Sequence, residues 1–136
     1  MSKRKAFIFD IDGTLALMGK REPHDYSKVG EDKVNKPVRE MLWALYESFD
    51  ILIFTGRPLS CHHDTENWLR RMKIPYTKLF MRRTEDPDHV IKEHMYDVMK
   101  NTHKVLGVFE DRKRVKKMWV KLGIFVFDVN QHDKEY

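Results

Sequence analysis

The stretch that most constrains the fold is a short apolar run that ends in two closely spaced aspartates. Residues 6–9 (AFIF) are all apolar, and Asp10, Asp12 and Gly13 follow at once. A run of this kind predicts a strand that is buried on both faces, as in a parallel sheet. A carboxylate at the end of a buried strand loses hydration, and a second carboxylate nearby adds repulsion. The pattern therefore favours a site where a cation or a reaction uses both aspartates over an ordinary surface turn.

Apolar runs and helical patterns alternate along the rest of the chain. Apolar runs predict four further strands, over residues 51–54, 76–81, 105–109 and 124–127. Helical spacing predicts four helices: one from residues 36–37 onward, one over 60–73, one opened by residues 86–88 and one ended by Gly123. Five buried strands alternating with four helices predict an α/β fold, a Rossmann-like three-layer sandwich with a five-stranded parallel sheet.

The helical patterns also predict which side chains face the core. The apolar stripes include Met41, Val98 and Leu122. Trp43 belongs to such a stripe as well, which favours a place in the core over a stacking platform. Asp86 precedes a proline at the first helical position, so we expect it to cap the helix that follows.

Length and composition indicate one soluble domain. The chain has 136 residues, of which 41% are apolar and 35% charged. Neither residues 16–35 nor residues 80–86 are long enough for a separate cap domain, so we expect a single domain over residues 1–136. The first apolar run is too short for a signal peptide or a membrane span, and Cys61 is the only cysteine. Both facts favour a cytoplasmic protein without a membrane contact.

Polar side chains follow three of the predicted strands, at the point where each strand ends. They are Asp10 and Asp12, Thr55 and Arg57, and Glu110 and Asp111. In an open parallel sheet, ligands bind at the carboxyl ends of the strands. We therefore expect these side chains to converge on one site.

The string DxDGT after an apolar strand resembles the first motif of the haloacid dehalogenase (HAD) superfamily. The resemblance implies that Asp10 attacks phosphorus to form an aspartyl-phosphate and that Asp12 is the general acid and base. The pair Glu110–Asp111 resembles the acidic motif that binds magnesium in that superfamily. The implied Mg²⁺ ligands are Asp10, the backbone carbonyl of Asp12, Asp111 and, directly or through water, Glu110.

Two further stretches resemble the phosphate-binding motifs of the same superfamily. Thr55 follows the second core strand, where the hydroxyl and the N–H groups of the Gly56 turn could hold phosphate oxygens. Arg57 offers a planar donor fork that suits phosphate. Lys92, in the first turns of the helix opened by residues 86–88, resembles the lysine that neutralises the nucleophile and the transferring phosphate.

A closer resemblance covers nearly the whole chain and concerns the phosphatase domains of bacteriophage-type polynucleotide kinase–phosphatases. The matching stretches lie at residues 10–19, 21–26, 55–57, 88–93, 110–112 and 118–119. This likeness implies a 3′-phosphatase that acts on DNA or RNA ends. The nucleotide-binding string GxxxxGK[ST] does not occur in the sequence, so kinase activity would have to come from a separate protein.

Charge and loop lengths favour a large substrate. The net charge of +5 permits phosphate-bearing partners, and an open basic site suits a strand end. Arg82 and Arg83 after the third strand, and Arg112 after the fourth, are candidates for nucleic-acid contacts. A small-molecule phosphatase such as a nucleotidase stays open as an alternative, as does a catalytically silent nucleic-acid-binding module. The sequence also leaves open a homo-oligomer, whose partner subunit could cover the site.

Overall fold

The computed structural model describes residues 2–19 and 21–130. Its strands are β1 (Arg4–Phe9), β2 (Ala16–Leu17), β3 (Lys33–Val34), β4 (Asp50–Pro58), β5 (Lys78–Arg82), β6 (His103–Glu110) and β7 (Val126–Asp128). Its α-helices are α1 (Lys36–Tyr46), α2 (His62–Arg71), α3 (Asp88–Met99) and α4 (Lys113–Lys121), with short 3₁₀ helices η1 (Tyr26–Glu31) and η2 (Leu59–Cys61).

Five strands form one parallel sheet in the order β5-β4-β1-β6-β7. The first strand is central, and Phe9 lies in register with Ile53 of β4 and with Phe109 of β6. The chain leaves β1 first toward β4 and later toward β6, so the direction of winding reverses beside β1. In sheets of this kind that reversal opens a crevice at the carboxyl ends of the strands. The α/β, Rossmann-like fold expected from the sequence is confirmed.

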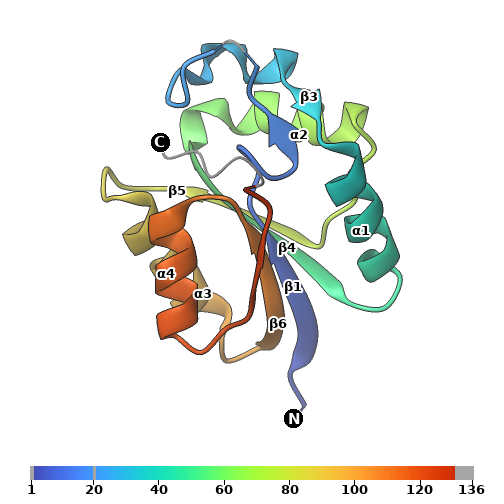
Figure 1. Cartoon of the computed structure of the whole chain (residues 1–136), viewed down its shortest axis with the longest axis vertical. Helices are drawn as coiled ribbons and strands as arrows, with labels where there is room; N and C mark the ends of the chain where they lie inside the picture. Colours follow the sequence, from blue (N-terminus) through green and yellow to red (C-terminus); the bar gives the residue numbers. More distant parts are fainter. Residues whose placement is uncertain (1, 20, 131–136) are drawn as a thin grey trace.

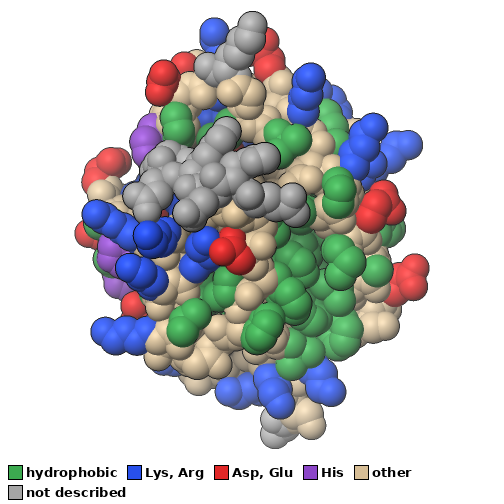
Figure 2. Space-filling model, in the orientation of Figure 1, with side chains coloured by type: hydrophobic (Ala, Val, Ile, Leu, Met, Phe, Trp, Pro, Cys, Tyr) green, Lys and Arg blue, Asp and Glu red, His purple; other side chains and the backbone are tan. Residues whose placement is uncertain are grey.

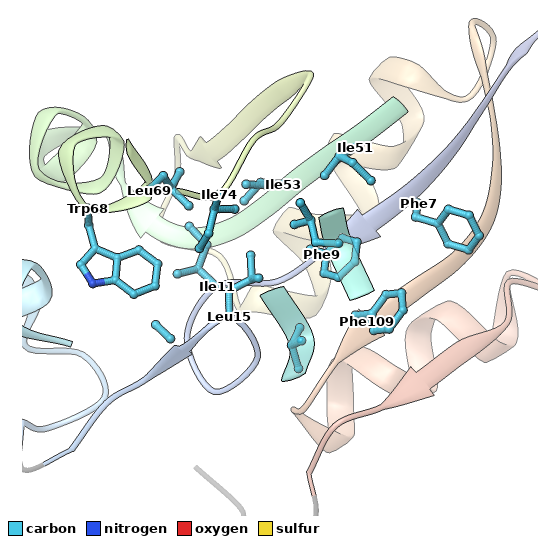
Figure 3. Packing of buried hydrophobic residues seen from close by; sticks show 13 residues of the cluster. Phe7, Phe9, Ile11, Leu15, Ile51, Ile53, Trp68, Leu69, Ile74 and Phe109 are labelled. Carbon is cyan, nitrogen blue, oxygen red and sulfur yellow. The ribbon is translucent and has the colours of Figure 1, made fainter. Parts of the chain in front are cut away.

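Helices cover the two faces of the sheet and enclose two apolar clusters. On one face, α1 and α2 contribute Leu42, Trp68 and Leu69 to a cluster that also contains Phe9 and Ile53 of the sheet. Figure 3 shows Trp68 and Leu69 in this cluster. On the other face, α3 and α4 lie side by side and bury their apolar stripes against the opposite side of the same strands (Figure 1). The resulting three layers are helices, sheet and helices, and they hold the carboxyl ends of β1, β4 and β6 at one edge.

The segment between β1 and α1 turns sharply and then folds back over the edge of the sheet. Gly13 has a φ of 85°, a left-handed conformation that glycine adopts at little cost. Over the described residues of this segment, β2 and β3 pair antiparallel, and η1 lies against α2. Trp68 of α2 fixes this arrangement by donating from Nε1 to the carbonyl of Asp32 at 2.8 Å. Over its described residues, the segment forms a short ribbon and a turn.

Some side chains predicted to face the core do not. Met41 and Leu122 are exposed, Val98 is 74% exposed and Trp43 is 42% exposed. The inward line of α3 runs through Ile91, Met95 and Met99, so Val98 lies on its flank. The ring of Trp43 lies on the surface, where Nε1 donates to the carbonyl of Lys73 at 2.8 Å.

The start of α3 also differs from expectation. Pro87, rather than Asp86, occupies the N-cap position, and no side-chain cap bond is formed there. Among the helices of the described residues, none is both long and apolar enough to cross a membrane.

Candidate active site

Asp10 stands at the centre of the site because β1 is the central strand. It comes directly after β1, and its N–H donates to the carbonyl of Phe109 at 3.1 Å. The side chain is buried, with 5% of its surface exposed. Residues at the carboxyl ends of β4 and β6 therefore flank its carboxylate from both sides.

Lys92 of α3 joins the carboxylates of two strands. Its ammonium donates to Asp10 Oδ1 and to Glu110 Oε1, each at 2.7 Å, and the side chain is fully buried. Burial lowers the pKa of Lys92, but the two carboxylates outweigh that effect and raise it. One lysine charge cannot balance two carboxylates. Burial, together with the charge of Glu110, consequently raises the pKa of Asp10 well above its usual range.

A third carboxylate completes a compact group of oxygen ligands. Oxygen atoms of Asp10, Glu110 and Asp111 lie within 4.8 Å of one another, and all three side chains are buried. Thr14 donates from Oγ1 to Asp10 Oδ2 at 3.1 Å and approaches Asp111 Oδ1 at 3.4 Å. Mg²⁺ prefers such oxygen ligands, and a divalent cation would offset the repulsion among them. The residues present therefore fit the implied magnesium ion.

Two arginines hold Asp12. Arg57 Nη2 lies 2.8 Å from Asp12 Oδ1, and Arg21 Nη2 lies 2.6 Å from the same oxygen. Asp32 also accepts from both arginines, from Arg21 Nε at 2.9 Å and, at 3.3 Å, from the same Arg57 Nη2 that contacts Asp12. Burial raises the pKa of Asp12, but the charges of Arg57 and Arg21 outweigh it, so the pKa lies below its usual value. The network fixes the orientation of the Asp12 carboxylate.

Three of the four residues expected to bind phosphate lie together in β4, which runs on past the predicted end at residue 54 to Pro58, and the fourth, Lys92, is on α3. Thr55 is buried and accepts from the backbone N–H of Arg57 at 3.1 Å. A Cβ on Gly56 would come within 2.6 Å of Asp88 Oδ1, so any other residue there would require the Asp88 carboxylate to shift. The Arg57 guanidinium contacts Asp12, Asp32 and Thr65 and is fully buried. Contacts of these residues with phosphate stay predictions.

An open cleft of about 990 Å³ lies next to the site, and its lining includes Pro58 and Arg112, the chain neighbours of Arg57 and Asp111. Arg82 and Arg112 line it, and Asp88 at the start of α3 accepts from both guanidinium groups. Arg82 also donates from Nε to the carbonyl of Gly56 at 2.7 Å, which ties the cleft to the end of β4. Arg83 borders a separate hollow of about 400 Å³. The structure thus brings two of the three candidate arginines together. Figure 2 shows further Lys and Arg side chains over α4, beside this cleft.

Three residues of the site were not assigned roles in the sequence analysis. Arg21 and Asp88 fall within stretches that carry the closer resemblance, so that likeness was the one available signal. Asp32 has no local pattern that marks it, because its contacts are with Arg21 and Arg57, which are distant in the sequence.

Comparisons with known proteins agree with this geometry. The family model "Polynucleotide kinase PNKP phosphatase domain" matches residues 4–133. A putative bifunctional polynucleotide kinase/RNA ligase of Autographa californica nuclear polyhedrosis virus is 32% identical over an alignment of 133 residues, which covers 92% of this chain and 19% of the viral protein. A chain in the structure of a Pnkp1/Rnl/Hen1 complex superposes with a TM-score of 0.89 at 31% identity, over 93% of this chain and 46% of that one.

A more distant structure shares the fold. A putative phosphatase from Clostridium difficile superposes with a TM-score of 0.66 at 18% identity, over 94% of this chain and 86% of that one. The chain spans about a fifth of the viral relative and less than half of the chain in the Pnkp1 complex. The single-domain boundary at residues 1–136 stays a prediction.

Proposed function

The chain belongs to the family of polynucleotide kinase (PNKP) phosphatase domains, which are HAD-type phosphatases, and from this premise we propose a magnesium-dependent polynucleotide 3′-phosphatase. The observation that carries the proposal is the cluster at the end of β1. There Asp10 lies beside one buried lysine and within 4.8 Å of two further carboxylates. That arrangement suits a nucleophile that must approach a charged phosphate.

The residues of the site divide the reaction between them. An Asp10 oxygen forms a bond to phosphorus while the bond to the 3′-oxygen of the strand breaks, giving an aspartyl-phosphate. Water then displaces Asp10 from phosphorus and releases inorganic phosphate. We assign Asp12 as the acid that gives a proton to the leaving oxygen in the first step and as the base that takes one from water in the second. Because the arginines lower its pKa in the free protein, Asp12 must take up the first proton when the charged substrate binds. Lys92 holds Asp10 in position.

Asp10, Glu110 and Asp111 would hold the magnesium ion. When bound, Mg²⁺ neutralises charge on the phosphate and orients one of its oxygens.

The cleft supports a strand end as substrate. Its lining carries five Lys and Arg side chains against three Asp and Glu side chains, and it is open to solvent. A polyanion gains from such a surface, whereas a small metabolite needs an enclosed pocket. Because one relative comes from a structure described as an RNA repair complex, RNA ends are the first substrates to test. A kinase acting on the same ends would be a separate protein or domain.

The test compares four substrates at equal concentration with Mg²⁺. They are a 3′-phosphorylated RNA oligonucleotide, the matched DNA, the 5′-phosphorylated RNA and a 3′-mononucleotide. We expect phosphate release mainly from the 3′-phosphorylated strands. Asp10→Asn and EDTA should each abolish release, while Asp97→Asn, at an exposed carboxylate on α3, should leave it unchanged.

Other outcomes would reject parts of the proposal. Release mainly from the mononucleotide would make the enzyme a nucleotidase. Binding without release by the wild type would favour a silent nucleic-acid-binding module. Full activity in EDTA would reject the role of magnesium.

A further inference from the structure

Two aromatic rings that the proposed reaction does not use line the cleft beside the site. His24 lies just before η1 and Tyr26 is the first residue of η1; their ring centroids are 6.4 Å apart and their planes meet at 71°. His24 Nδ1 and the Tyr26 hydroxyl are 3.5 Å apart. The two rings therefore meet edge to face, and both border the space that Arg82 and Arg112 also line. A flat, uncharged group could lie on one ring and touch the other with its edge.

Arg21 links the loop that carries these rings to the carboxylate of Asp12. Arg21 Nη2 contacts Asp12, while Nη1 donates to the carbonyls of Pro23 at 3.1 Å and Asp25 at 3.3 Å. Those two carbonyls belong to the residues that directly precede and follow His24. One guanidinium thus sets the position of the loop relative to Asp12.

The other side of the loop is fixed by Asp25. Its Oδ1 accepts from the backbone N–H of Ser27 at 3.2 Å and from the Ser27 hydroxyl at 2.6 Å. This bond caps η1 and holds Tyr26, the first residue of that turn. Burial, and after it the negative charges of Asp12 and Asp88, raise the pKa of Tyr26, in keeping with a ring that lies near the reacting centre.

We propose that His24 and Tyr26 form a stacking subsite for the nucleobase of the nucleotide that bears the phosphate. This inference rests on the proposed function and specifies how its substrate is held. A cleft of about 990 Å³ is far larger than one phosphate requires and has room for a nucleotide. Stacking on an aromatic ring accepts every base, because each base has a π-face. The subsite therefore selects strand ends that carry a base, without selecting which base.

The arginines of the cleft complete the subsite. Asp88 accepts from both Arg82 and Arg112 and keeps both guanidinium groups at the cleft. The phosphodiester that precedes the terminal nucleotide carries one negative charge, and guanidinium groups are suited to phosphate oxygens.

The test removes either an aromatic ring from the protein or the terminal base from the substrate. Phosphate release is measured for a 3′-phosphorylated oligonucleotide, for the same strand with an abasic terminal nucleotide, and for glycerol phosphate. The variants are Tyr26→Ala, His24→Ala and, as the matched control, Tyr26→Phe. Thermal unfolding is measured for each variant, since Tyr26 is half-buried.

We expect wild-type KM to be about tenfold higher for the abasic strand than for the intact strand. Tyr26→Ala should raise KM for the intact strand by about the same factor and leave the abasic KM and kcat unchanged. Tyr26→Phe should behave as the wild type, and His24→Ala should show a smaller rise of the same kind. An equal rise for both strands would show that Tyr26 only supports the loop, and no rise for either would overturn the subsite.

A binding measurement separates this inference from the proposed function. Fluorescence anisotropy with labelled, unphosphorylated strands gives Kd without turnover. A preference of the wild type for the strand with its terminal base, lost in Tyr26→Ala, supports the subsite even if no substrate releases phosphate. Equal Kd values for both strands in the wild type would refute it even if the 3′-phosphatase activity is found.

Discussion

Replacing Lys92 with methionine should destabilise the fold strongly, because it removes the cation between two buried carboxylates. Nζ lies 2.7 Å from Asp10 and 2.7 Å from Glu110, and all three side chains are buried. Breaking a buried ion pair on one side costs about 3–5 kcal/mol. A domain of this size has a total stability of about 5–15 kcal/mol, so Lys92→Met should lose a large share of it. Phosphatase activity should fall below detection.

Urea unfolding in EDTA measures this cost without interference from bound metal. The double variant Lys92→Met/Glu110→Gln should regain more than about 1 kcal/mol relative to Lys92→Met, because one of the two uncompensated charges is removed. The control is Lys100→Met at the end of α3. Lys100 is 47% exposed and pairs with Asp97 on the surface, so this change should shift the unfolding free energy by less than about 0.5 kcal/mol.

Two results would refute this reasoning. A loss in Lys92→Met no larger than in Lys100→Met would show that the buried ion pairs do not contribute to stability in solution. Additive losses for Lys92→Met and Glu110→Gln would show that the two side chains do not interact.

Three further predictions follow from other contacts. Arg57→Lys keeps the charge but not the fork that holds Asp12, so kcat should fall about 10²-fold with circular dichroism unchanged; an unaltered kcat would contradict the positioning role. The pKa of Asp50 is lowered, mainly by the hydrogen bond from Arg4 and also by His103. The Asp50 carboxylate therefore stabilises the folded state above the unfolded pKa of about 3.9, and this stabilisation is lost as pH falls through the lower folded pKa. Asp50→Asn should therefore cost about 1 kcal/mol in urea unfolding at pH 7 and progressively less below pH 4, and a pH-independent loss would exclude this pairing. Mg²⁺ at about 100 times its Kd should raise the unfolding free energy by about 2.7 kcal/mol in the wild type and by less in Asp111→Asn; equal gains would place the ion elsewhere.

The core strands and the convergence of the site could be predicted from the sequence because the relevant signals are local. An apolar run that stops at a polar residue marks the end of a buried strand, as at Asp10 and Glu110. A parallel sheet then brings such ends to one edge whatever their separation in the sequence. Lys92 could also be predicted from the sequence, since the motif that it resembles occurs at the start of a helix.

The partners of the site side chains could not be predicted in the same way. Arg57 looks like a phosphate ligand in isolation, yet in the fold its donors reach Asp12 and Asp32. Only the tertiary path of the segment between β1 and α1 places Asp32 there. The exposure of Val98 could not be predicted either. Apolar spacing predicts which stripe of a helix faces the sheet, but it does not predict how much of that stripe the sheet covers.

The central place of β1 has a consequence for the order in which the protein gains activity during folding. Phe9 pairs on one side with Ile53 and on the other with Phe109, and both partners are distant from it in the sequence. Parallel pairings between such distant segments have high contact order and form slowly. The nucleophile, the lysine and the acidic pair meet only once β1 lies between β4 and β6. Enzymatic activity should therefore return in the slowest phase of refolding, after the helices have regained their circular dichroism.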